Sequence, residues 1–143
     1  MSVTYISAEL RRLVVARADG LCEYCLIAAD DTFFGCELDH VISEKHGGLT
    51  HADNLAYACV FCNQAKGSDI GSIHWEGGNF VRFFNPRSDR WTEHFRWEGD
   101  QVAGLTPVGR ATLILLGLNR PRRVLIRRAE AMFGWFPPPE AGP

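Results

Sequence analysis

The sequence has no long hydrophobic run. None of its segments approaches the ~20 consecutive apolar residues that a membrane-spanning helix needs, which excludes a transmembrane protein. The first residues, MSVTYISAELRRL, also lack the apolar stretch and the small-residue cleavage site of a signal peptide. We therefore expect a cytoplasmic protein in a reducing compartment, where structural disulfides are rare.

The sequence also has no large excess of charge of one sign. Its 143 residues carry a formal net charge of −2, and 46% of them are hydrophobic, which is the composition of one globular domain. The two halves differ, because residues 1–80 hold 5 basic and 11 acidic side chains, whereas residues 81–143 hold 10 and 6. Lysine is scarce: thirteen of the fifteen basic residues are arginine, whose forked donor set suits phosphate groups.

Four of the five cysteines form two C-x-x-C pairs, Cys22 with Cys25 and Cys59 with Cys62. In a reducing compartment two such pairs predict a tetrahedral zinc site with four thiolate ligands. The alternatives are four unrelated buried thiols or a redox pair. The 33 residues between Cys25 and Cys59 exceed what a simple zinc ribbon needs, so we expect this insert to have structure of its own. Cys36 has no partner in the pattern and is interpreted as a small core residue.

Local signals predict the elements of the first half of the chain. Ser7 suits the amino-terminal cap of a helix over residues 7–19. Alternation and turn residues predict a strand over 33–42 and a short return strand over 54–58. The segment after the second cysteine pair is long enough only for a two-turn helix, which Gly67 should end.

The second half of the chain is predicted to hold strands and two helices. Gly99 and Asp100 suit the turn of a hairpin, and Thr106 followed by Pro107 suits the start of a helix. The expected elements are a strand at 79–84, a hairpin at 94–105, and helices at 106–116 and 119–133.

The insert between the two cysteine pairs carries polar residues in a specific order. Asp39 is followed by His40, Asn54 lies beside the return strand, and Asn63 directly follows the last cysteine. Together with the Gly-Gly turn and the Lys-Gly after the second pair, this order resembles the HNH endonuclease family, the ββα-metal nucleases, in its short zinc-containing bacterial branch. The resemblance covers residues 22–67, about a third of the chain.

The resemblance implies an α+β fold. Its core would be a ββα-metal hairpin and helix over residues 20–68, held by the four-cysteine zinc site. A C-terminal extension over 79–136 would add a further hairpin and helices. We expect residues 1–136 to form a single nuclease domain and residues 137–143 to form a disordered tail.

The same residue types suit phosphodiester hydrolysis, which needs an activated water and a cation beside the phosphorus oxygens. Asp39 and the amide oxygen of Asn63 are hard oxygen donors of the kind that Mg²⁺ or Mn²⁺ prefers. Histidine changes its charge near neutral pH, which makes His40 the expected general base. The resemblance implies that His40 activates water, that Asn54 ties the hairpin loop through backbone hydrogen bonds, and that the products carry 5′-phosphate and 3′-hydroxyl ends.

Two features bear on this expected site. Adjacent residues of a regular strand point to opposite faces, so Asp39 and His40 serve one site only where the strand is bulged or ends. The family's final histidine is replaced here by Asn63, a common variant that changes the expected metal ligand more than the expected activity.

Basic side chains near and beyond this segment are candidates for holding the DNA backbone. Aromatic residues alternate with arginines over residues 80–91, an arrangement that can stack on bases and hold phosphates. The preferred interpretation of that stretch is a strand with one buried face. The residues considered for phosphate contact are Lys66, Arg82, Arg87, Arg90, Arg123 and Arg127.

The last helix has a predicted inner and outer face. Leu125, Ala129, Met132 and Phe133 fall on one side at helical spacing and should pack on the core. Arg123 and Arg127, four residues apart, fall on the opposite side and should be solvated, where they would contact phosphates without reading bases. A charged outer face without DNA contacts is the alternative.

The sequence thus predicts a metal-dependent endonuclease that hydrolyses DNA, taken as double-stranded, with structural Zn²⁺ and catalytic Mg²⁺ or Mn²⁺. One alternative is a non-catalytic zinc-stabilised module that binds nucleic acid or protein, in which Asp39 and His40 have no role. Another is an RNA-directed or host-defence nuclease with the same centre.

Overall fold

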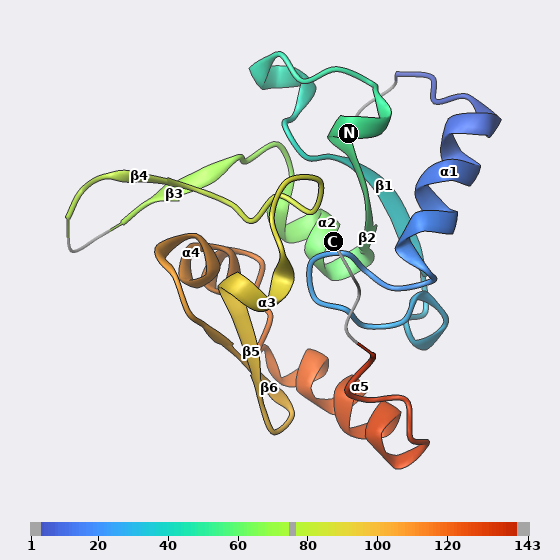
Figure 1. Ribbon diagram of the computed structural model, residues 1–143, viewed down its shortest axis with the longest axis vertical. Coiled ribbons are helices and arrows are strands. Elements are labelled where there is room, and N and C mark those ends of the chain that lie inside the picture. The colour runs from blue at the N-terminus through green and yellow to red at the C-terminus, as the bar shows by residue number, and fades with distance from the viewer. Residues whose placement is uncertain (1–3, 75–76, 140–143) are drawn as a thin grey trace.

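The computed structural model describes residues 4–74 and 77–139 (Figure 1). Within these ranges, two-stranded antiparallel sheets alternate with helices, which confirms the α+β class. The sheets pair β1 (Cys36–His40) with β2 (Leu55–Cys59), β3 (Gly71–Ile73) with β4 (Phe80–Arg82), and β5 (Phe95–Glu98) with β6 (Gln101–Gly104). The α-helices are α1 (Ala8–Ala18), α2 (Val60–Lys66), α3 (Trp91–His94), α4 (Pro107–Leu115) and α5 (Pro121–Met132).

The helix ends follow from their capping residues. The Ser7 hydroxyl accepts a hydrogen bond from the Leu10 amide at 3.1 Å, which starts α1 as predicted. The Thr106 hydroxyl accepts one from the Gly109 amide at 3.0 Å and starts α4 in the same way. Helix α2 ends at Gly67, which adopts a positive φ of 51° and breaks the helical path.

The first hairpin and the helix after it form one continuous unit. Strands β1 and β2 pair so that Asp39 lies opposite Ala56 and His40 lies opposite Leu55. Cys59 is both the last residue of β2 and the cap of α2, so no loop separates the strand from the helix. This is the hairpin-and-helix order expected for residues 20–68.

The second half agrees with the prediction in its hairpin and departs from it in one strand. Strands β5 and β6 form the hairpin predicted over 94–105, and Gly99 in its turn has a φ of 63°. The strand predicted at 79–84 is present as the shorter β4. Its partner β3 was not predicted, because three residues beginning with glycine give no alternating pattern.

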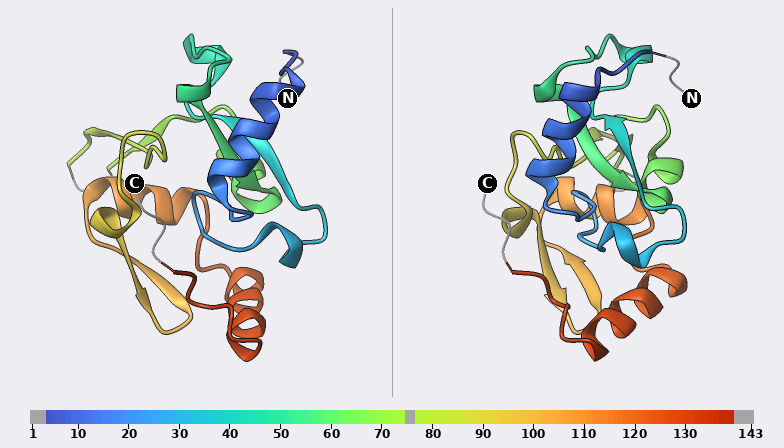
Figure 2. Two further views of the ribbon diagram at one scale, coloured as in Figure 1. Left: turned by 45° about the vertical axis from the view of Figure 1, so that its right-hand side comes forward. Right: turned by 90° about the vertical axis from the view of Figure 1, so that its right-hand side faces the viewer.

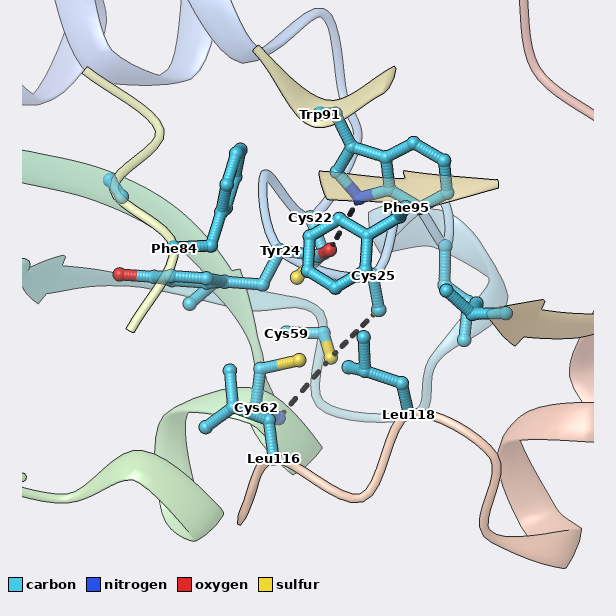
Figure 3. Packing of buried hydrophobic residues seen from close by; sticks show 14 of the residues in the cluster. Cys22, Tyr24, Cys25, Cys59, Cys62, Phe84, Trp91, Phe95, Leu116 and Leu118 are labelled. Atoms are coloured by element: carbon cyan, nitrogen blue, oxygen red, sulfur yellow. Dashed lines mark hydrogen bonds between the residues drawn. The ribbon is translucent and has the colours of Figure 1, made fainter. Parts of the chain in front are cut away.

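The buried core joins the two halves of the chain around the cysteines. The indole nitrogen of Trp91 donates a 2.9 Å hydrogen bond to the carbonyl oxygen of Tyr24, which ties α3 to the loop between the first two cysteines. Figure 3 shows the cysteines surrounded by side chains from the later elements. The labelled members of this cluster are Cys22, Tyr24, Cys25, Cys59, Cys62, Phe84, Trp91, Phe95, Leu116 and Leu118.

Helix α5 lies within the predicted residues 119–133, but its inner face is different from the one expected. Arg123 and Arg127 are 2% and 0% exposed, so the expectation that both are solvated was wrong. Leu125, Met132 and Phe133, which were expected to pack on the core, are 59%, 85% and 72% exposed. The physical reason is that buried acceptors bind the terminal nitrogens of the two guanidinium groups, which the spacing of apolar residues cannot reveal.

Those acceptors are mostly backbone carbonyls of the α4–α5 connection and the β5–β6 turn. Arg123 donates to the carbonyl oxygen of Leu116 at 2.8 Å, and Arg127 donates to that of Asp100 at 2.9 Å and to that of Leu118. The two arginines therefore fasten α5 to the core, and buried in this way they are not free to contact DNA.

The loop between β1 and β2 lies at one end of the molecule, and helix α5 lies at the opposite end, as both views in Figure 2 show. No helix within residues 4–74 and 77–139 is both long and apolar enough to cross a membrane. Of the expected tail, residues 137–139 form no helix or strand, and residues 140–143 lie outside the described part of the chain.

Candidate active site and metal centre

The four cysteines of the two C-x-x-C pairs come together in one buried cluster. Cys22 and Cys25 lie in the loop after α1, Cys59 ends β2, and Cys62 lies in the first turn of α2. Their four sulfur atoms all lie within 4.8 Å of one another, and all four residues are buried. The sulfur atoms of Cys25 and Cys59 are 3.7 Å apart. A zinc tetrahedron with ~2.3 Å bonds has sulfur–sulfur edges of about 3.8 Å, so this donor set fits zinc.

Burial and neighbouring groups shift the pKa values of the thiols in the cluster. Burial raises the pKa of Cys22 and of Cys62, whereas hydrogen bonds from the neighbouring thiols lower that of Cys59. The guanidinium of Arg123 donates to the sulfur of Cys62 at 3.4 Å. A positive charge at this distance favours the thiolate form that a metal ligand needs. All five cysteines are described, and none of them forms a disulfide.

Asp39 and His40 are the last two residues of β1. The register with β2 continues to His40 without a bulge, and the strand ends there. Both residues line a cleft of about 700 Å³, together with Asn63 from α2. Because β1 ends at His40, Asp39 and His40 can serve one site although the strand has no bulge. Together with Asn63 they line one cleft.

The carboxylate of Asp39 has close partners on both oxygens. The hydroxyl of Tyr24 donates to one oxygen at 2.7 Å, and the ammonium of Lys66 lies 3.2 Å from each of them. Burial raises the pKa of Asp39, although Lys66 and Tyr24 act in the opposite direction. A carboxylate has about four acceptor sites, so these two partners leave room for a further ligand.

Lys66 does not occupy the position expected of a phosphate contact. It is 1% exposed and donates to the carbonyl oxygen of His40 at 2.9 Å as well as to Asp39. Lys66 was considered for phosphate contact, but its ammonium is buried against the end of β1 and is not open to a phosphate. Its charge instead stabilises the ionised form of Asp39.

His40 is held by a residue of the loop that follows β1. Its Nε2 atom lies 2.9 Å from the hydroxyl oxygen of Thr50 and 3.9 Å from a carboxylate oxygen of Glu44. These contacts fix the orientation of the imidazole ring at the wall of the cleft. Neither Thr50 nor Tyr24 was singled out from the sequence, since a lone hydroxyl carries no pattern.

Asn54 fastens the same loop through its side-chain amide. Its oxygen accepts from the Ile42 amide at 2.8 Å, and its nitrogen donates to the carbonyl oxygens of Ile42 and Leu49, each at 2.9 Å. These are the kind of backbone hydrogen bonds that the resemblance implied. The loop also crosses itself closely at Gly48, where an added Cβ would lie 1.6 Å from the Ile42 carbonyl oxygen. Only glycine fits that crossing.

Two of the three candidate arginines between β4 and α3 are held by acidic partners. Arg82 forms a two-pronged ion pair with Asp89, with nitrogen–oxygen distances of 2.6 and 3.1 Å. Arg87 is paired with Glu23 and is largely buried. Arg90 is exposed. Of this group, Arg90 is the one that stands open to solvent without a described ion pair.

Comparison with known proteins bears on the same segment. The model of the HNH endonuclease family matches residues 22–69, which contain both cysteine pairs, β1, β2 and α2. Searches of curated proteins and of solved structures found no significant match. Residues 22–69, about a third of the chain, are therefore similar to the HNH endonuclease domain.

Proposed function

We propose that this protein is a metal-dependent endonuclease that hydrolyses the phosphodiester bonds of double-stranded DNA. The observation that carries the proposal is that Asp39, His40 and Asn63 line one cleft inside the HNH domain. This cleft offers a base and two hard oxygen donors at one place, which is what phosphodiester hydrolysis requires. The products would carry 5′-phosphate and 3′-hydroxyl ends, as the resemblance implies.

Each of the three residues has a distinct proposed role. Asp39 and the amide oxygen of Asn63 would hold Mg²⁺ or Mn²⁺, which when bound neutralises charge on the phosphate oxygens and on the leaving oxygen. His40 takes the proton from the attacking water, and Thr50 keeps its ring in place. Asn54 acts indirectly, because it holds the loop that carries Thr50.

The four-cysteine cluster has a structural role in this proposal. Its sulfur atoms are buried and close enough for one Zn²⁺, and they join the loop after α1 to the start of α2. A closed four-thiolate site leaves no coordination position for substrate. Zinc would therefore hold the fold around the cleft, while the oxygen donors serve the reaction.

The proposal is tested by nicking of supercoiled plasmid DNA with Mg²⁺. The wild-type protein should convert the plasmid to open circles, and His40→Ala should be slower by about 10²- to 10⁴-fold, the usual contribution of a general base. His51→Ala is the matched control, because His51 is 64% exposed and lies outside the cleft. Cleavage by His40→Ala at the wild-type rate would remove His40 from the mechanism.

The same assay separates the alternatives. A non-catalytic zinc-stabilised binding module predicts no nicking by the wild-type protein with any divalent cation. An RNA-directed nuclease with the same centre predicts that RNA of similar length is cut faster than the plasmid. Either result would replace the proposed substrate or the proposed activity.

A further inference from the structure

A second cleft lies on the neighbouring face of α2 from the proposed active site. Its volume is about 440 Å³, and its lining includes Phe61 and Gln64 from α2. The opposite wall is formed by the end of α4, the α4–α5 connection and the first turn of α5. That wall contributes Leu115, Arg120, Arg122 and Arg123.

The side chains that line this second cleft carry a net positive charge. Three arginines line it, and no acidic residue is among its lining residues. Arg120 and Arg122 are exposed, and in the described part of the chain neither forms an ion pair. The proposed active-site cleft is different, because Glu37, Asp39 and Glu44 line it alongside its basic residues.

The fold fixes where two of these arginines lie. The side chain of Arg120 crosses the turn at Gly117, where an added Cβ would lie 2.5 Å from the Arg120 Nε atom. Arg123 is held against the ring of Phe61, with its guanidinium carbon 4.9 Å from the ring centroid, and against the sulfur of Cys62. Arg123 is therefore a fixed part of the cleft wall, and Arg120 lies over the turn beside it.

The position of this cleft relates it to the proposed active site. Gln64 lines both clefts, and the two lie on adjacent faces of the same helix. An α-helix with its side chains is about 10–12 Å across. The phosphates of one DNA strand follow each other every ~3.4 Å along the duplex axis, so a strand passing over α2 would bring a phosphate a few nucleotides away to the second cleft.

We propose that the second cleft is a phosphate-binding site that holds the DNA backbone a few nucleotides from the bond to be cut. Arg120 and Arg122 make the contacts, since their forked donors match phosphate oxygens. Arg123 is buried and shapes the wall without touching DNA. This inference rests on the proposed function for its substrate, and it assigns the backbone contact to arginines that the sequence pattern did not single out.

The test compares two double variants that each remove two positive charges. Arg120→Ala with Arg122→Ala alters the cleft, whereas Arg12→Ala with Arg110→Ala alters two exposed arginines that line neither cleft. Binding of a short DNA duplex is measured without divalent cation at several salt concentrations. Each lost phosphate contact should flatten the log–log salt dependence by about 0.9, so the cleft variant should be shallower by up to about 1.8.

The control variant should keep the wild-type slope of the salt dependence. Arg122→Ala alone should flatten that slope by about half as much as the double variant does. An equal loss in both double variants, or no loss in the folded cleft variant, would overturn the phosphate site. The outcome is separate from that of the proposed function, which the plasmid assay with Mg²⁺ measures. A changed slope without any cleavage would leave the phosphate site standing and remove the nuclease activity.

Discussion

The ammonium nitrogen of Lys66 lies 3.2 Å from each carboxylate oxygen of Asp39, and both side chains are buried. Exposed ion pairs contribute only about 0–1 kcal/mol to stability. Removing one member of a buried pair costs about 3–5 kcal/mol, because the remaining charge has no partner. We predict that Lys66→Met lowers the free energy of unfolding by about 3–5 kcal/mol.

The double variant Asp39→Asn, Lys66→Met checks this cause. It leaves no uncompensated charge, so it should regain most of the stability lost in Lys66→Met. Denaturant unfolding of the wild type, both single variants and the double variant gives the coupling energy. Strictly additive losses would mean that the two charges do not stabilise each other.

The cysteine cluster gives a second prediction. Structural Zn²⁺ contributes on the order of 10–16 kcal/mol to folding in small zinc-binding peptides. Cys62→Ser should therefore yield misfolded protein, and the purified wild type should contain one zinc per chain. Cys36→Ser is the matched control, because Cys36 lies outside the four-cysteine group. Metal analysis well below one zinc per chain, or a fully folded Cys62→Ser protein, would contradict the zinc site.

The loop that holds His40 gives a third prediction. Asn54→Ala removes three hydrogen bonds to the backbone of Ile42 and Leu49. Cleavage should fall by about 10- to 10²-fold, since small displacements of a catalytic group are costly in rate, and duplex binding should change little. The control is Asn79→Ala at an exposed position. A variant with wild-type cleavage would show that the loop keeps its shape without Asn54.

Glu130 makes the stability of the protein depend on pH. Burial, reinforced by the neighbouring Asp31 carboxyl, raises the pKa of Glu130 from 4.5 to about 7. Between these values the folded protein holds a proton that the unfolded chain releases. The contribution of Glu130 is therefore complete below about pH 4.5 and is lost as the pH rises through about 7.

The variant Glu130→Gln should lack this loss. Its free energy of unfolding, compared with the wild type, should rise between about pH 4.5 and pH 7 and level off above pH 7. Glu93→Gln, at an exposed position on α3, should follow the wild type. Parallel pH profiles for the wild type and Glu130→Gln would show that folding does not change the pKa of the Glu130 carboxyl.

The sequence predicted those parts of the fold that depend on local chemistry. Ser7 and Thr106 identified helix starts because a capping hydroxyl acts within three residues of its own position. The C-x-x-C spacing likewise identified the four cysteines that the structure brings together. In each case the partners are close in sequence or share a repeated motif.

The inner face of α5 could not be predicted in this way. Arg123 and Arg127 are buried because carbonyl oxygens of Leu116, Leu118 and Asp100 accept from them, and these partners belong to other elements. Periodicity assigns charged residues to the solvent side and has no knowledge of such acceptors. The same limit explains Lys66, whose partner Asp39 lies 27 positions earlier in the chain.

Helix α2 spans only seven residues, and it begins within the cysteine cluster and carries Asn63 in its next turn. A chelator that removes Zn²⁺ from the four cysteines would therefore also free the start of α2, the helix that carries the proposed metal ligand Asn63. Such a chelator would inhibit the enzyme in two ways, by removing the catalytic Mg²⁺ and by removing the structural Zn²⁺. Adding Mg²⁺ alone would reverse only the first. If cleavage returns only when Zn²⁺ is added before Mg²⁺, the zinc site must form before the magnesium site can bind its ion.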